Sequence, residues 1–290
     1  TQEQYQKLPT LKEKAFKNRV YDVEYLSGKE LLKMEPNLNP ETKAGLYIPR
    51  ESIIDPFLLV VGYAENAQQN GADFLLGTEV TGMHVEQGKI TVVETTAGEI
   101  SCKWVINAAG LHCDEIAAMV GKNDYTVNPR KGQFYVLDKN TSCKVEHIIL
   151  PIPTKVTKGK LMCPTIHGNM LVGPTAEDLS DKEDRSTDAA GLKSVAEDVR
   201  HLIPNVNLRD TITQYSGLRP NRNPEGLHVD TYEDLTNYVN LSGVRSTGLT
   251  ASASLGKYVA QTLLKLGMSA EMNPDFNPVR KGIVRFRELT

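Results

Sequence analysis

The sequence has few of the residues that would build a metal centre, and it has no long apolar run. Its four cysteines stand at positions 102, 113, 143 and 163, and none forms a Cys-x-x-Cys pair. We therefore expect no zinc or iron–sulfur site, and unpaired thiols in a reducing, cytoplasmic location. The longest apolar stretches, such as residues 148–152, are far too short for a transmembrane segment.

Strong charge of either sign is also missing. The formal net charge is −3, with 24% charged and 40% hydrophobic residues, which is ordinary for a globular protein. This balance gives no reason to expect nucleic acid or an anionic membrane as a partner. The first ten residues are polar and lack the apolar core of a secretory signal.

The pattern of predicted elements changes twice along the chain. Residues 55–128 combine helix and strand patterns, and Asp55-Pro56 is a typical helix start. From residue 129 to 211, short strand patterns are separated by proline and glycine turns, which is typical of an antiparallel sheet. Residues 212–270 return to strands and a long helix. The sequence thus predicts an α/β (α+β) fold of two interleaved domains.

The remaining segments complete this division. Residues 1–54 form the first part of the antiparallel domain with an N-terminal helix, and residues 271–290 read as a linker or tail. Within the domains, we predict a capping box at Ser27 and Glu30, and strands over residues 73–76 and 145–151.

Three stretches together carry a family resemblance: Val-Ile-Asn-Ala-Ala-Gly at 105–110, Ser-Gly-Leu-Arg-Pro at 216–220, and Ser-Gly-Val-Arg-Ser-Thr-Gly-Leu-Thr at 242–250. Their order and spacing resemble FAD enzymes of the D-amino-acid-oxidase-like superfamily. Glycerol-3-phosphate dehydrogenases and L-2-hydroxyglutarate dehydrogenases fit best. The resemblance implies a partial Rossmann-like FAD-binding domain in residues 55–128 and 212–270, and a substrate domain with an antiparallel sheet in the rest.

The resemblance also implies the residues of a cofactor site. A strand that ends in small residues lets a cofactor lie against its backbone, and a helix N-terminus stabilises negative charge. By this resemblance, Arg245 would face the flavin, and the backbone of a strand at Val80 would contact the adenine of FAD. The expected cofactor-binding residues are Val80, Ala108, Ala109, Gly110, Gly217, Arg245, Gly248, Leu249 and Thr250.

Arg219 is the residue that the resemblance implies for catalysis and substrate binding. A guanidinium is planar and always charged, so it suits a carboxylate or a phosphate. Tyr47 and Lys131 are further substrate-binding candidates. The expected reaction is hydride transfer from a small anionic 2-hydroxy substrate to flavin N5, with glycerol 3-phosphate first and L-2-hydroxyglutarate as the alternative.

The glycine fingerprint of such a cofactor domain is absent, because no two glycines in this sequence are separated by a single residue. In the family it precedes the region that this chain matches. We therefore expect the chain to be a fragment that binds FAD weakly or not at all, with full binding in the complete parent. A fragment that is not catalytic is a further alternative. Peripheral membrane association and a C-terminal iron–sulfur module stay open for the parent, and the electron acceptor is not identified.

Overall fold

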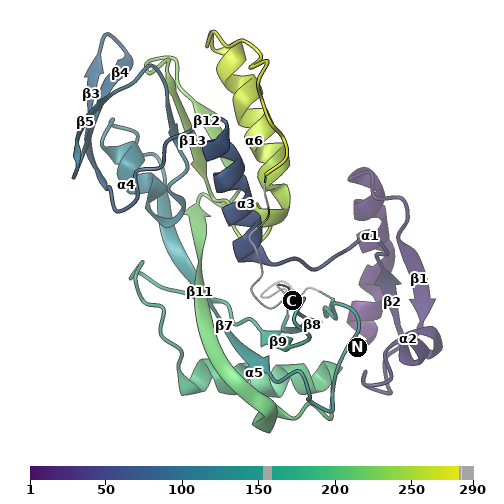
Figure 1. Ribbon diagram of the computed structural model, residues 1–290. Coiled ribbons are helices and arrows are strands. Elements are labelled where there is room, and N and C mark those ends of the chain that lie inside the picture. The colour runs from purple at the N-terminus through teal and green to yellow at the C-terminus, as the bar shows by residue number, and fades with distance from the viewer. Residues whose placement is uncertain (153–158, 281, 283–290) are drawn as a thin grey trace, which may run out of the picture. The chain divides into compact units, whose positions relative to one another are not determined.

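The computed structural model describes residues 1–152, 159–280 and 282, and the chain forms two compact units (Figure 1). Unit 1 comprises Thr1–Ile54 and Pro129–Leu218, and unit 2 comprises Asp55–Asn128 and Arg219–Thr290. The sequence placed the last change of domain after residue 211, whereas the units change after Leu218. The roles of the two units in binding FAD and substrate stay predictions.

Unit 1 begins with a small lobe of two helices and two strands. Helix α1 (Gln2–Lys17) starts at a capping box formed by Thr1 and Gln4. Strand β1 (Glu24–Ser27) pairs antiparallel with β2 (Ala44–Tyr47). Between them, α2 (Gly28–Met34) starts at the predicted capping box, in which Ser27 and Glu30 exchange hydrogen bonds.

A five-stranded sheet lies mostly in unit 1, in the order β10-β7-β9-β8 with β11 also paired to β7, and the start of β7 and the end of β11 belong to unit 2. Its strands are β7 (Thr126–Leu137), β8 (Leu161–Pro164), β9 (Met170–Gly173), β10 (Glu177–Asp178) and β11 (Thr211–Asn223). Helix α5 (Ala189–Leu202) buries Val195 and Val199 against this sheet, and the short helix η2 (Leu208–Asp210) precedes β11. Apolar residues at a helical spacing thus give this helix its buried face.

Unit 2 contains two three-stranded sheets and three α-helices among its described residues. One sheet has the order β12-β13-β6 and the other β3-β4-β5. The first consists of β6 (Val105–Asn107), β12 (His228–Thr231) and β13 (Tyr238–Ser242), and the second of β3 (Val80–Glu86), β4 (Lys89–Thr95) and β5 (Gly98–Ser101). The helices are α3 (Pro56–Gln69), α4 (Cys113–Ala118), which follows the short helix η1 (Gly110–His112), and α6 (Gly248–Lys265).

The mixed α/β fold class with antiparallel sheets is confirmed, but two predicted strands are wrong. Residues 73–76 are not a strand, and Leu76 is 88% exposed, because no described strand lies beside this segment to complete a ladder. Residues 145–151 contribute only an isolated bridge from Ile149 to Met162. Residues 271–280 have no regular structure, while residues 281 and 283–290 of the predicted linker lie outside the described residues.

Candidate cofactor site

Two neighbouring strands of unit 2 end at the same edge of their sheet. Strand β6 pairs parallel with β13, with Val105 opposite Tyr238 and Asn107 opposite Asn240. Because the strands run in one direction, the residues that follow them leave the sheet side by side. Open α/β sheets bind ligands at this carboxyl edge. Ala108, Ala109 and Gly110 follow β6 at this edge, as the turn from Gly243 follows β13.

The glycines at this edge have two different structural roles. Gly110 has a φ of +60°, and a Cβ built on it would meet no heavy atom within 4 Å. Gly243 has a φ of +68°, and a Cβ there would lie 1.8 Å from the carbonyl oxygen of Gly226. Gly110 therefore leaves the backbone open on one side, whereas Gly243 lets two turns pack tightly.

The turn after β13 leads into the N-terminus of α6. This helix starts at Gly248, and its first turn contains Leu249 and Thr250. Its N-cap residue, Thr247, makes no side-chain capping hydrogen bond. The first amides of a helix have no intrahelical acceptor and carry its positive dipole end. The first turn of this 18-residue helix can therefore donate to an anionic group.

A buried hydrogen-bond network fixes the two strand ends. The Asn107 Nδ2 donates to the Cys113 carbonyl oxygen at 2.7 Å and to the Asn240 Oδ1 at 2.9 Å. The Tyr125 hydroxyl donates to the same Cys113 oxygen at 2.9 Å, and the Asn240 Nδ2 donates to the Tyr125 hydroxyl at 3.0 Å. Burial raises the pKa of Tyr125 and of Tyr238 far above the usual range, so both phenols stay neutral. The network stabilises the strand ends without any charge.

Arg245 lies in the turn that precedes α6, and its guanidinium has two partners. Nη1 donates to the Asn221 Oδ1 at 2.8 Å, and Nη2 lies 2.5 Å from the Glu225 Oε1. The charge of Arg245 is therefore paired within unit 2. Arg219 stands two residues before Asn221 in β11 and is half-buried.

A second arginine, Arg222, is buried behind the same turn with only 6% of its surface exposed. Its guanidinium lies 4.5 Å from the Tyr125 ring centroid, and Nη1 donates to the Pro224 carbonyl oxygen. Among the described residues, the buried Arg222 Nε and Ser242 Oγ have no hydrogen-bond partner. Buried donors of this kind are normally satisfied by water or by a ligand. These donors, the small residues and the helix end together fit an anionic nucleotide cofactor.

The other predicted site residues lie elsewhere in the fold. Val80 begins β3, in the second sheet of unit 2. Tyr47, Lys131 and Gly217 belong to unit 1. The structure therefore gathers Ala108, Ala109, Gly110, Arg245, Gly248, Leu249 and Thr250 at one edge of unit 2, and the roles of all the predicted residues stay predictions.

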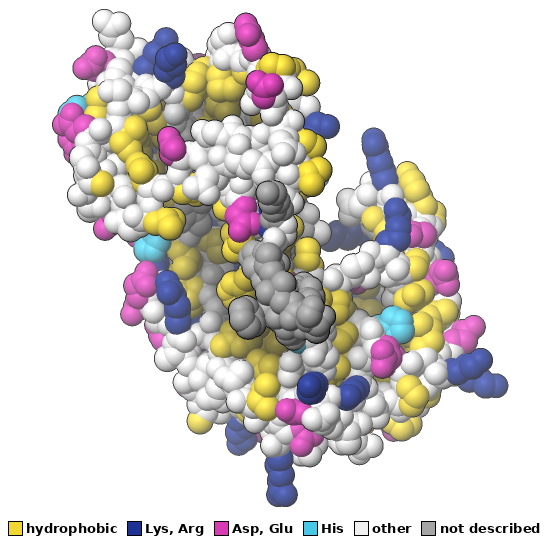
Figure 2. All heavy atoms as spheres, in the orientation of Figure 1, with side chains coloured by type: hydrophobic (Ala, Val, Ile, Leu, Met, Phe, Trp, Pro, Cys, Tyr) yellow, Lys and Arg dark blue, Asp and Glu magenta, His cyan; other side chains and the backbone are white. Residues whose placement is uncertain are grey.

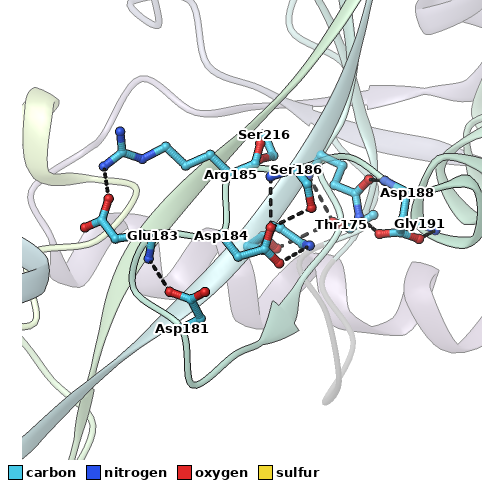
Figure 3. Close-up of polar contacts among 11 residues, drawn as sticks. Thr175, Asp181, Glu183, Asp184, Arg185, Ser186, Asp188, Gly191 and Ser216 are labelled. Atoms are coloured by element: carbon cyan, nitrogen blue, oxygen red, sulfur yellow. Dashed lines mark hydrogen bonds and ion pairs between the residues drawn. The ribbon is translucent and has the colours of Figure 1, made fainter.

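Lys131 is 4% exposed, and its Nζ lies 3.1 Å from the Asp184 Oδ2. Asp184 also accepts hydrogen bonds from the backbone nitrogen and the hydroxyl of Ser186 (Figure 3). Burial lowers the pKa of Lys131, but the bond to Asp184 and the nearby Glu177 and Asp188 outweigh it, so the net pKa is raised. This geometry supports a structural role, in which Lys131 fixes the segment that carries Asp184.

The sequence interpretation missed Asn107, Asn240 and Arg222. A signal was present, because one asparagine interrupts each of the apolar strands Val-Ile-Asn and Tyr-Val-Asn-Leu. An asparagine in a buried strand needs partners for its amide, so two of them predict a shared network.

These features are those of an α/β protein with an edge suited to a nucleotide cofactor at the carboxyl ends of its parallel strands. The chain belongs to the FAD dependent oxidoreductase family, whose model matches residues 1–262.

Similar proteins support this assignment. A glycerol 3-phosphate dehydrogenase of Caloramator mitchellensis is 34% identical over 283 residues, covering 98% of this chain and 59% of that protein. An L-alpha-glycerophosphate oxidase structure from Mycoplasma pneumoniae, with FAD bound, superposes with a TM-score of 0.87 at 29% identity, covering 96% of this chain and 73% of that one. An Escherichia coli L-2-hydroxyglutarate dehydrogenase is 26% identical over 156 residues, 53% of this chain and 36% of that protein. The chain thus spans about three fifths of the Caloramator relative.

Within the residues that the structure describes, no group of three or more histidine, cysteine, aspartate or glutamate side chains is arranged to hold a metal ion. No helix in the described part of the chain combines the length and the apolar character that crossing a membrane requires.

Proposed function

We propose that the protein built around this chain oxidises glycerol 3-phosphate with FAD. The observation that carries the proposal is the edge of unit 2, where Ala108–Gly110 and the first turn of α6 lie at the ends of two parallel strands. When bound, FAD supplies the acceptor for the hydride of the substrate carbinol. The names of the Caloramator and Mycoplasma relatives favour glycerol 3-phosphate as the substrate.

The residues of this chain have separate tasks in the proposed site. The backbone at Ala108, Ala109 and Gly110 gives the cofactor a flat contact, and the amides of Leu249 and Thr250 stabilise negative charge. Arg219 binds the anionic end of the substrate through its planar pair of donors. Arg245, already paired with Glu225, orders the turn that leads into α6.

Binding of the cofactor pyrophosphate requires a glycine-rich turn that these 290 residues do not contain. We expect the isolated chain to lose FAD during gel filtration, because the main contacts to the pyrophosphate are absent. The measurement is the flavin absorbance of the eluted protein against its peptide absorbance. Stoichiometric FAD in the isolated chain would contradict this expectation.

The substrate assignment is tested with Arg219→Lys in the complete, FAD-loaded protein. Lysine keeps the charge but loses the two-pronged contact, so kcat/KM should fall about 10- to 100-fold while FAD stays bound. Arg209→Lys is the matched control, because Arg209 is an exposed residue of η2, and it should leave the kinetics unchanged. Near wild-type kcat/KM in Arg219→Lys would show that Arg219 does not anchor the substrate.

The same assay separates the alternative substrate. If L-2-hydroxyglutarate is oxidised with a higher kcat/KM than glycerol 3-phosphate, the substrate proposal is wrong and the flavin proposal stands. If the complete protein binds no flavin, both are wrong. Arg245→Lys should change the reduction potential of the flavin and leave the KM for the substrate nearly unchanged. The reason is that the turn with Arg245 leads into the N-terminus of α6, whereas Arg219 is the proposed substrate anchor.

A further inference from the structure

A basic segment stands out against the acidic balance of the chain. Residues 12–21, called the α1 tip here, contain Lys12, Lys14, Lys17 and Arg19 but only one carboxylate, Glu13, which gives a formal charge of +3. The whole chain has a formal charge of −3, so the remaining residues sum to −6. Among the described residues, no carboxylate lies within ion-pair distance of these four cations. The neighbouring Asp22 is bound by both prongs of Arg50, so it does not neutralise the tip.

Two aromatic side chains are exposed among these cations. Phe16 is 44% exposed and Tyr21 63% exposed, and their ring centroids lie 5.6 Å apart in an edge-to-face arrangement. Figure 2 shows blue basic and yellow apolar side chains together at the end of the lobe that contains α1. Each ring thus shields part of the other while keeping a large face in water.

The backbone presents Arg19 in an unusual conformation. The residue follows the C-cap Asn18 and has a φ of +62°, with the Val20 nitrogen bonded to the Ala15 carbonyl oxygen at 2.9 Å. Glycine is the favoured residue at such a helix end, since a Cβ is strained there. Arg19 stands between Phe16 and Tyr21 in the sequence. Its positive φ brings a backbone strain that a glycine at this position would avoid.

We propose that the α1 tip is a contact for the surface of an anionic lipid bilayer. Aromatic rings and lysines side by side suit the interfacial region, where rings enter the headgroup layer and lysines meet anionic lipids. A protein partner fits less well, because protein interfaces are depleted in lysine. Two half-exposed rings also offer only about 200 Å² of apolar surface, well below the roughly 800 Å² per partner of a stable complex.

This inference does not depend on the proposed function, since vesicle binding needs no flavin. The test is co-sedimentation of the protein with vesicles of phosphatidylcholine alone, or of phosphatidylcholine mixed with phosphatidylglycerol. We expect binding only to the mixed vesicles, and weaker binding as salt rises. Absence of binding to the mixed vesicles, or equal binding to both kinds, would overturn the proposal.

The decisive variant is Lys14→Glu with Lys17→Glu. Each cation near an anionic surface contributes about fivefold to partitioning, so the double change should weaken binding at least about 25-fold. Lys29→Glu with Lys33→Glu on α2 is the control, because it makes the same change of net charge at exposed positions of the same unit. An equal loss in the control would show that net charge, and not the tip, determines binding.

A second measurement reports contact directly and does not rely on lost binding. In Tyr21→Trp, tryptophan emission should shift to shorter wavelength on mixed vesicles and be quenched by brominated lipid. The wild-type protein contains a single tryptophan, Trp104, whose signal is subtracted. Unchanged emission in Tyr21→Trp on vesicles that sediment with the protein would place the contact elsewhere and overturn the proposal.

Discussion

Unit 1 and unit 2 bury their interiors in different ways. In unit 1, one continuous apolar cluster joins the sheet to α5, and it includes Leu137, Met162, Val172, Val195 and Ile203 at 2% exposure or less. In unit 2, the buried apolar residues form three smaller clusters. A polar network that contains Asn107, Tyr125 and Asn240 lies between the strands and α4.

The two units therefore differ in the interactions that fix the positions of their buried residues. An apolar core stabilises through buried area and close packing, without fixing any single group. A buried amide network is directional, and each member positions the next. Unit 2 uses such a network directly beneath the edge where we propose the cofactor binds, because there the positions of the strand ends matter for function.

The largest effect should come from a cavity in the core of unit 1. Leu137→Ala should lower the free energy of unfolding of unit 1 by about 3–4 kcal/mol, because the residue is fully buried within the cluster. Amide hydrogen exchange read by mass spectrometry should show faster exchange in β9 and α5 than in β13. Leu264→Ala on α6 is the control, since Leu264 is half exposed and its loss should have little effect. Equal acceleration in β9 and β13 would mean that the units do not unfold separately.

A smaller effect, confined to unit 2, should follow the loss of the Asn107 amide. Asn107→Ala leaves the Cys113 carbonyl oxygen and the Asn240 amide short of a partner, which should cost about 2–3 kcal/mol. Denaturant unfolding and hydrogen exchange of β6 and β13 measure it. Asn169→Ala is the matched control in unit 1, where the amide makes one partly buried bond to the Leu137 carbonyl oxygen. If both variants lower the free energy of unfolding by the same amount, the Asn107 network stabilises unit 2 no more than a single side-chain hydrogen bond stabilises unit 1.

The sequence was sufficient for features that depend on local chemistry. Asp55-Pro56 and the Ser27–Glu30 box start helices where predicted, because caps and N1 prolines act within one turn. The sequence failed for residues 73–76, whose apolar pattern is that of a strand but whose strand state needs a neighbour that the described residues do not supply.

The candidate site was predictable only in part for a similar reason. Small residues and a helix start are visible in a sequence, so Ala108–Gly110 and Gly248–Thr250 could be named. The partner of a charged group is not visible, because it is set by tertiary distance. Lys131 resembled a substrate-binding cation, yet it is buried against Asp184, 53 residues further along the chain. Arg245 likewise has Glu225 as its partner, which no motif indicated.

The smallest expected effect concerns the charged contact between Lys131 of β7 and the segment around Asp184, both within unit 1. Hydrogen bonds from the Ser186 hydroxyl and backbone, and then from Lys131, lower the pKa of Asp184 to about 2. A carboxyl whose folded pKa is depressed adds stability above its usual value near 4, and this contribution is lost as the pH falls towards 2. The raised pKa of Lys131 keeps its ammonium charged throughout that range.

Amide exchange at Ser186 should therefore accelerate between pH 4 and pH 2, beyond the intrinsic change with pH. Because the Asp184 side chain is one-third exposed, the effect should stay local and leave the global unfolding midpoint almost unchanged. Asp184→Asn removes the titrating group, so it should abolish the pH-dependent step and leave the segment loosened at every pH. A step that survives in Asp184→Asn would assign the titration to another carboxyl and would show that Lys131 holds this segment by a different contact.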